Sequence, residues 1–193
     1  STWYNYHQRL NDEELLKQCI IAAEYGMKTV IIDDGWQTDD NRGGYAYCGD
    51  WNVCRTKIRD MRNLVDSIHK IGMKVMLWFS VPFVGIHSEN FKKFEGKYLN
   101  KPGECGILDP RFPECRKFTV ELYKNAALNW SLDGLKLDFI DSFKLTEYSS
   151  RDYGSMDYIS LEDAAEALLK EINTELKDLK PDFLIEFRQK YIG

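Results

Sequence analysis

Four short apolar segments, each followed directly by polar or aromatic residues, constrain the fold of this chain more than any other feature. They are residues 30–32, 75–77, 135–137 and 184–185, and they run into Asp33-Asp34-Gly35-Trp36, Trp78, Asp138 and Glu186-Phe187-Arg188. Segments of this length and composition are typical of buried parallel strands. When helices join such strands in a (β/α)8 barrel, the strand ends meet on one rim, where these enzymes carry their active sites.

Helical patterns separate the apolar segments. The first predicted helix begins at Asn11, with Glu14 placed as in a capping box, and the last begins at Ser160, with Asp163 three residues later. A second helix covers the apolar spacing from residue 61 to 71, and a third covers residues 114–129. The aromatic residues 2–6 are predicted to form the opening strand. The expected order is therefore five strands alternating with four helices.

A complete eight-stranded barrel takes about 250 residues, whereas the pattern predicts five strands in 193. We therefore expect residues 1–193 to be a single N-terminal portion of a barrel, with strands six to eight beyond the C-terminus. Unpaired strand edges in such a portion predict self-association. Three long connections, residues 37–58, 81–113 and 142–159, follow predicted strand ends, where barrels build their sites.

Composition and residue spacing argue against several classes of partner and cofactor. The net charge of −5 argues against a nucleic acid or an anionic membrane as partner. Residues 75–85 form the longest apolar stretch and are too few to span a bilayer, and no signal peptide is visible. We expect a soluble protein, either cytoplasmic or periplasmic. The five cysteines and three histidines show no metal-ligand spacing, so neither a metal nor a cofactor is expected.

The strongest chemical signal is Lys136 followed two residues later by Asp138. Alternation along a strand places both side chains on the same face. A nearby lysine favours the charged form of a carboxylate, and an ionised carboxylate is what a glycosidase nucleophile requires. A structural ion pair is the alternative interpretation, although burying two charges that have no functional role costs desolvation free energy.

The other strand ends predict binding groups. Asp33 and Asp34 are suited to accept hydrogen bonds from sugar hydroxyls or to bind a divalent cation, although Asp-Asp-Gly is also a common turn. Trp51 in the first long connection is suited to stack on a sugar ring or to anchor the loop. Glu186 and Arg188 share a face of the last strand, where they either contact ligand or pair with each other.

Taken together, the motifs resemble the catalytic barrel of glycoside hydrolase family 36, the melibiase-type α-galactosidases, and their clan relatives in family 27. The series is Asp33-Asp34-Gly35-Trp36, Gly49-Asp50-Trp51, Gly72-Met73-Lys74 leading to Leu77-Trp78-Phe79, Leu108-Asp109-Pro110 with Pro113-Glu114, and Lys136-Leu137-Asp138. It covers nearly the whole chain, and the motifs occur in one order.

The resemblance implies a retaining glycoside hydrolase acting on terminal α-galactosides by double displacement. It implies that Asp138 is the nucleophile, that Lys136 with the paired aspartates holds galactose hydroxyls, and that tryptophans line the sugar subsite. The substrate-binding residues predicted from pattern and resemblance together are Asp33, Asp34, Trp36, Trp51, Trp78, Lys136, Glu186 and Arg188.

The sequence departs from the family pattern in three places. Leu137 stands where many members have tryptophan, and Gln37 where many have phenylalanine. The general acid/base of the family is an aspartate well beyond the nucleophile, and nothing between residues 141 and 193 matches it. We therefore expect this chain to lack the acid/base and to be inactive or nearly so by itself.

Two other functions fit parts of the pattern. One is a non-catalytic carbohydrate-binding or structural domain that keeps the aromatic rim. The other is a Mg²⁺-dependent α/β hydrolase of doubly wound fold, with Asp33, Asp34 and Asp138 as ligands. No phosphate-binding glycine-rich loop follows the first strands, which argues against the second function.

Overall fold

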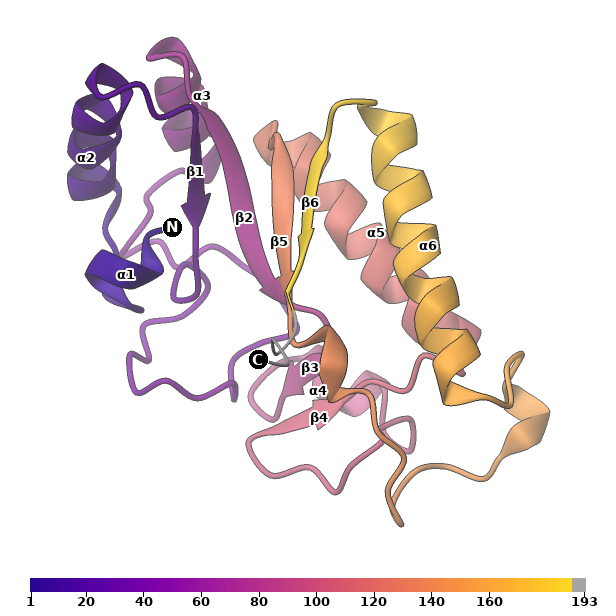
Figure 1. Cartoon of the computed structure of the whole chain (residues 1–193). Coiled ribbons are helices and arrows are strands. Elements are labelled where there is room, and N and C mark those ends of the chain that lie inside the picture. The colour runs from indigo at the N-terminus through magenta and orange to yellow at the C-terminus, as the bar shows by residue number, and fades with distance from the viewer. Residues whose placement is uncertain (189–193) are drawn as a thin grey trace, which may run out of the picture.

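The computed structural model describes residues 1–188, which form one parallel sheet covered by helices (Figure 1). The sheet contains β1 (Thr29–Ile32), β2 (Lys74–Ser80), β5 (Gly134–Asp138) and β6 (Leu184–Phe187). Neighbours in the order β1-β2-β5-β6 all pair in parallel, so the strands of this sheet lie side by side in the order in which they occur along the chain. All four strands predicted after the opening segment are thereby confirmed.

Four long helices cover the strands, and the last three of them lie between successive strands of the sheet. They are α2 (Asp12–Glu24), α3 (Met61–Lys70), α5 (Pro113–Trp130) and α6 (Leu161–Leu179). Each packs against the next, in the order α2, α3, α5, α6. This single layer of helices is what sequential right-handed crossovers produce in a (β/α)8 barrel. A doubly wound fold would instead place helices on both faces of the sheet.

The predicted helix caps are confirmed. The Asn11 side chain accepts a hydrogen bond of 3.0 Å from the backbone N–H of Glu14, and the Ser160 hydroxyl accepts one of 3.1 Å from that of Asp163. Each cap satisfies a backbone donor that the first helical turn leaves without a partner.

The predicted opening strand is wrong: a short helix, α1 (Trp3–Tyr6), occupies this segment. The backbone N–H of Tyr6 bonds to the Thr2 carbonyl at 2.9 Å, which closes a helical turn. Aromatic residues favour strands mainly through their packing on a sheet. Here the segment touches β1 through one backbone bond, from Thr2 N–H to the Ile31 carbonyl at 2.9 Å.

The second long connection carries structure of its own. It contains β3 (Phe83–Gly85), α4 (Asn90–Lys93) and β4 (Cys105–Ile107), and β3 pairs antiparallel with β4. These elements lie beyond the carboxyl ends of the parallel strands (Figure 1). They enclose a second apolar cluster, which consists of Val84, Phe94, Tyr98, Leu108, Phe112 and Cys115.

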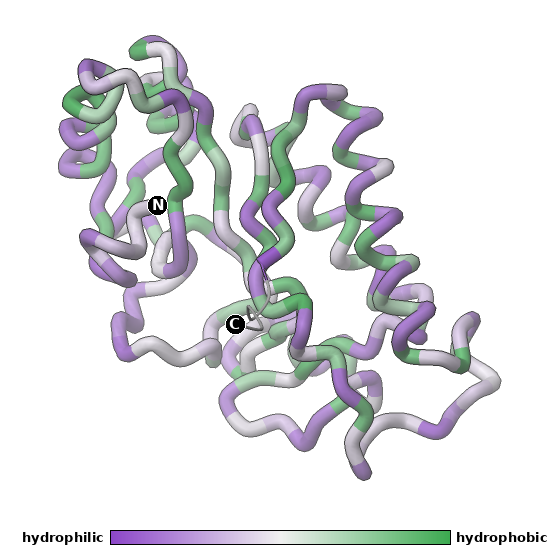
Figure 2. The backbone as a smooth tube through the Cα atoms, in the orientation of Figure 1, coloured by the Kyte–Doolittle hydropathy of each residue, from purple (hydrophilic) through white to green (hydrophobic). Residues whose placement is uncertain are grey.

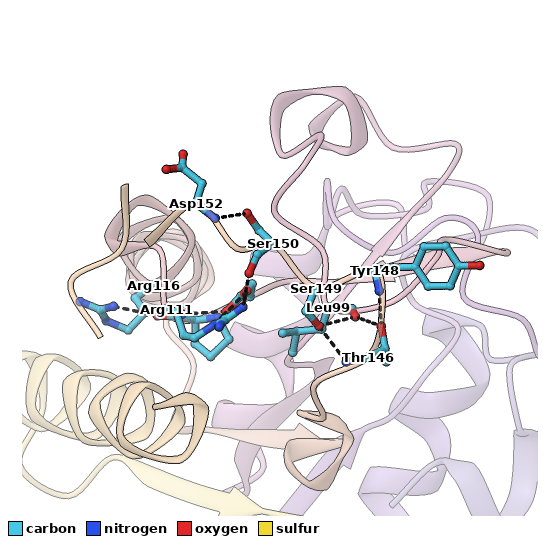
Figure 3. Close-up of polar contacts among 10 residues, drawn as sticks. Leu99, Arg111, Arg116, Thr146, Tyr148, Ser149, Ser150 and Asp152 are labelled. Atoms are coloured by element: carbon cyan, nitrogen blue, oxygen red, sulfur yellow. Dashed lines mark hydrogen bonds and ion pairs between the residues drawn. The ribbon is translucent and has the colours of Figure 1, made fainter. Parts of the chain in front are cut away.

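Polar contacts fix the third connection, which contains the 3-10 turns η1 (Ile140–Ser142) and η2 (Tyr153–Ser155). The Thr146 and Ser149 hydroxyls both donate to the Leu99 carbonyl, and the Arg111 guanidinium donates to the Ser150 carbonyl at 3.0 Å (Figure 3). The Tyr148 ring points away from this group of contacts. Because every donor and acceptor here lies in one of two loops, the contacts hold the second and third connections together.

The main core lies between the sheet and the helix layer. Hydrophobic residues form continuous stretches within β1 and β2, whereas hydrophilic and hydrophobic residues alternate along α6 (Figure 2). Every residue of β5 is buried, but the residues of β6 are only half-buried or exposed. In the described part of the chain, no helix is both long and apolar enough to cross a membrane.

Candidate active site

A cavity of about 490 Å³ opens at the carboxyl ends of the parallel strands. Seven of the nine predicted site residues line it: Asp33, Asp34, Trp78, Lys136, Asp138, Glu186 and Arg188. They come from the ends of all four parallel strands, because parallel strands of similar length bring their carboxyl ends to one rim. The sheet therefore gathers groups that are up to 155 positions apart in the sequence, the separation of Asp33 and Arg188.

Asp138, the last residue of β5, is 5% exposed and held at both carboxylate oxygens. Its Oδ2 accepts a hydrogen bond of 3.1 Å from the Trp78 indole, and its Oδ1 accepts 2.9 Å bonds from the Phe139 backbone N–H and the Arg188 guanidinium. Phe139 adopts a left-handed conformation, with φ of 62°, so the chain turns sharply after the carboxylate. These contacts leave Asp138 with little freedom to rotate.

Lys136 lies between two carboxylates. Its Nζ is 2.7 Å from Oδ2 of Asp33 and 3.9 Å from Oδ2 of Asp138. Lys136 and Asp138 therefore lie on the same face of β5, as expected. The lysine, however, donates its direct hydrogen bond to Asp33, the residue that follows β1. One ammonium group thus connects the first and third strands of the sheet across the cavity.

Asp33 and Asp34 both line the cavity because the chain leaves the strand after Ile32, so strict alternation no longer applies. Asp33 accepts a 2.6 Å hydrogen bond from the Ser1 hydroxyl in addition to the one from lysine. Asp34 accepts bonds of 2.8 Å from the Gln8 and Gln37 side-chain amides. Burial raises the pKa of Asp34; the two amides act in the opposite direction, and Asp33 adds to the increase.

Trp36 and Trp51 do not line the cavity, which differs from their predicted place beside a sugar. Trp36 is fully buried; its ring stacks on that of Trp51 at 5.8 Å between centroids, and its indole N–H donates to the Trp78 carbonyl at 2.8 Å. Both rings belong to the main hydrophobic core.

Several lining residues carried no recognised signal in the sequence. Trp3 and Tyr4 belong to the segment for which the sequence predicts a strand, and Tyr45 lies in a connection without regular structure. The Tyr45 ring packs against Phe83 and Phe139, at 5.0 and 5.2 Å between centroids. Burial raises the pKa of the Tyr45 hydroxyl, which keeps it a neutral hydrogen-bonding group.

The cavity presents alternating charges, in the order Asp33, Lys136, Asp138, Arg188. With Asp34 and Glu186, the lining contains four carboxylates and the two cationic side chains. It offers many hydrogen-bond acceptors and donors, which suits a ligand rich in hydroxyl groups. Among residues 1–188, no group of three His, Cys, Asp or Glu side chains is arranged to hold a metal ion. The ammonium group of Lys136 already lies between Asp33 and Asp138, and the Arg188 guanidinium pairs with Asp138.

Comparison with known proteins finds similarity to alpha-galactosidases. The Melibiase family model matches residues 1–105. Alpha-galactosidase AgaA of Geobacillus stearothermophilus is 30% identical over 148 residues, which cover 72% of this chain and 20% of that protein. The chain thus spans about a fifth of the length of this curated relative.

Solved structures share the fold. The crystal structure of the same Geobacillus enzyme, a GH36 alpha-galactosidase, superposes with a TM-score of 0.77 at 21% identity, over 95% of this chain and 26% of that one. An alpha-galactosidase from Thermus thermophilus in complex with stachyose gives a TM-score of 0.68 at 24% identity, over 96% of this chain and 38% of that one.

Proposed function

This chain belongs to the melibiase family, and from that premise we propose that the full-length protein hydrolyses terminal α-galactosides by a retaining double displacement. The observation that carries the proposal is the setting of Asp138. It is a buried carboxylate at a strand end, held by Trp78 and Arg188 and faced by Lys136 inside the cavity. The relative with bound stachyose supports an oligosaccharide with terminal galactose as the substrate class.

In the first step, a carboxylate oxygen of Asp138 forms a bond to the anomeric carbon while the bond to the leaving oxygen breaks. The leaving oxygen takes a proton from a general acid. Water then attacks the same carbon, gives up its proton to that group, and releases Asp138. Lys136 and Arg188 stabilise the negative charge that returns to the carboxylate.

The remaining carboxylates of the cavity act on the sugar rather than on the reacting bond. Asp33 and Asp34 each already accept two or more hydrogen bonds, and they keep lone pairs that can accept bonds from hydroxyls. The proposal assigns the general acid/base to none of residues 1–188, in keeping with the expectation from the sequence.

The variant Asp138→Asn in the full-length protein tests the assignment. We expect hydrolysis of 4-nitrophenyl α-galactoside to fall by a factor on the order of 10³ or more, because the amide is a poor nucleophile. Binding of D-galactose, measured by calorimetry, should persist. Asp182→Asn makes the same chemical change at the opposite end of the sheet and should leave the rate unchanged. A near-normal rate in Asp138→Asn would rule the assignment out.

A non-catalytic carbohydrate-binding role remains the second candidate, since the same cavity would hold a sugar without cleaving it. The full-length protein would then bind D-galactose and release no 4-nitrophenol from the aryl galactoside. The magnesium-dependent alternative has less support, because the Lys136 ammonium group lies between Asp33 and Asp138, two of its three predicted ligands.

A further inference from the structure

Two glutamine side chains donate hydrogen bonds to the carboxylate of Asp34, one to each oxygen. Gln37 Nε2 lies 2.8 Å from Oδ1, and Gln8 Nε2 lies 2.8 Å from Oδ2. Gln8 is 3% exposed and belongs to the segment after α1, whereas Gln37 follows β1. Two segments that are 29 positions apart therefore converge on one carboxylate.

The orientation of both amides is fixed by backbone donors. The Gly43 N–H donates to Oε1 of Gln8 at 2.8 Å, and the Gly35 N–H donates to Oε1 of Gln37 at 3.0 Å. An amide turned the other way would place its NH₂ group against a backbone N–H and its oxygen against the carboxylate. Each amide therefore presents its NH₂ group, and only that group, to Asp34.

Asp34 needs such donors because its surroundings disfavour its charge. It is 3% exposed, and its neighbour Asp33 carries the same charge. The Tyr45 hydroxyl and the Cys48 thiol face it as neutral groups, since burial raises the pKa of each. Lys57 is the nearby cation, but its ammonium group donates to three oxygen atoms of neighbouring loop residues instead.

We propose that Gln8 and Gln37 are positioning residues that hold Asp34 as an ionised, oriented acceptor for sugar hydroxyls. Each carboxylate oxygen has about two acceptor sites, and each glutamine occupies one. The Gly35 backbone donates a further bond, and because Asp34 lines the cavity, the acceptor sites that remain are available to a ligand there. The inference rests on the proposed function for its ligand, a terminal galactose unit, and it adds a role for Gln37, where many family members differ.

If the inference holds, two substitutions at Gln37 should change KM with opposite dependence on pH. Gln37→Met keeps the length of the side chain but removes the donor, so the pKa of Asp34 rises and the ionised form is lost as the pH falls. Gln37→Glu keeps the shape and shares a proton with Asp34 at low pH; above the pKa of the pair, both groups ionise and repel.

The measurement is KM for 4-nitrophenyl α-galactoside from pH 5 to 8 in the full-length protein. For Gln37→Met, KM relative to wild type should increase by about tenfold toward pH 5, the effect of one unit in pKa. For Gln37→Glu, the ratio should increase by a similar factor toward pH 8. The value of kcat should change less than KM in both variants, because Asp34 does not touch the reacting bond.

Matched variants separate this role from a structural one. Gln8→Met and Gln8→Glu should repeat the two opposite slopes, and they serve if a Gln37 variant does not fold. Gln18→Glu makes the same change on the exposed face of α2 and should leave the KM profile as in wild type. Equal, pH-independent losses in the Met and Glu variants, or no loss in either, would overturn the inference.

An inactive wild-type protein would refute the proposed function without deciding this inference. In that case the pKa of Asp34 itself is measured by ¹³C NMR titration of its side-chain carboxyl in the full-length protein. Gln37→Met should raise this pKa by about one unit. An unchanged pKa would show that the glutamines do not tune the charge of Asp34.

Discussion

At the scale of single residues, the strand ends predict the carboxylates of the cavity but not their partners. Asp138 and Lys136 could be placed on one face because alternation is a local property of a strand. The bond from Lys136 to Asp33 spans 103 positions, so only the folded sheet determines it. For the same reason Gln8 gave no signal, since its function depends on the approach of a distant loop.

Glu186 provides a prediction at this scale, because it lines the cavity and faces Lys136 across the pairing of β5 with β6. As a binding group, it should affect affinity more than chemistry. We expect Glu186→Gln to raise KM for 4-nitrophenyl α-galactoside by roughly tenfold, the loss of one charge-assisted hydrogen bond, with kcat within a factor of about three. A collapse of kcat that added azide restores would instead identify Glu186 as the acid/base.

At the scale of elements, apolar periodicity correctly predicted four strands and four long helices, because each buries one continuous face. The strand predicted for residues 2–6 was wrong, since an aromatic composition does not specify whether the rings pack from a strand or from a helical turn. The β3–β4 pair was missed as well. Its strands have three residues each, too few for alternation to stand out.

The turn after β1 requires glycine, and this can be tested. Gly35 has φ of +108°, and a Cβ there would lie 2.5 Å from the Cα atom of Gln8. We expect Gly35→Ala to lower the free energy of unfolding by roughly 2 kcal/mol or more, from backbone strain and this clash. Gly26→Ala is the control, since its φ is +82° but nothing lies within 4 Å of the added atom. Urea unfolding measures both variants. If they lose the same free energy of unfolding, the requirement for space at Gly35 is contradicted.

Asp133 precedes β5, at the end of the sheet opposite the cavity, and connects three elements. It accepts hydrogen bonds from Val75 N–H at 2.8 Å, His69 at 2.7 Å and Lys180 at 2.6 Å. Burial opposes ionisation, but these bonds outweigh it and hold the pKa of Asp133 below its ordinary value.

A lowered pKa makes the contribution of Asp133 dependent on pH with a definite sign. Its stabilisation is complete above the pKa of the unfolded chain, about 3.9, and is lost as the pH falls through the lower folded value. We expect Asp133→Asn to cost about 1–3 kcal/mol at pH 7 and progressively less below about pH 4. Urea unfolding at several pH values measures this, and a cost that grows on acidification would contradict it.

At the scale of the whole molecule, the four strands and their single layer of helices form part of a barrel wall. Length and strand count predicted this from the sequence, because the ratio of residues to strands is nearly constant in βα repeats. The position of the open edge required the structure. Among the described residues, β6 pairs with β5 on one side and with no strand on the other.

An open parallel edge predicts self-association of the 193-residue chain. The N–H groups of Leu184 and Arg188 point to β5, where they bond at 2.8 Å to the Asp133 and Leu137 carbonyls, so the N–H of Ile185 points to the open side. Ile185→Pro should therefore weaken association while keeping the sheet. Light scattering over a concentration series measures this. Strictly monomeric behaviour of the unsubstituted chain at high concentration would contradict the prediction.

The central claim is that Asp138 becomes covalently bonded to galactose. Treating the full-length protein with a fluorinated α-galactosyl fluoride, whose ring fluorine slows the second step, should trap that intermediate. Peptide mass spectrometry should then find one fluorogalactosyl group, on the peptide that contains Asp138 and on that side chain. Label on a different carboxylate, or rapid turnover of natural galactosides with no labelled peptide at all, would contradict the assignment.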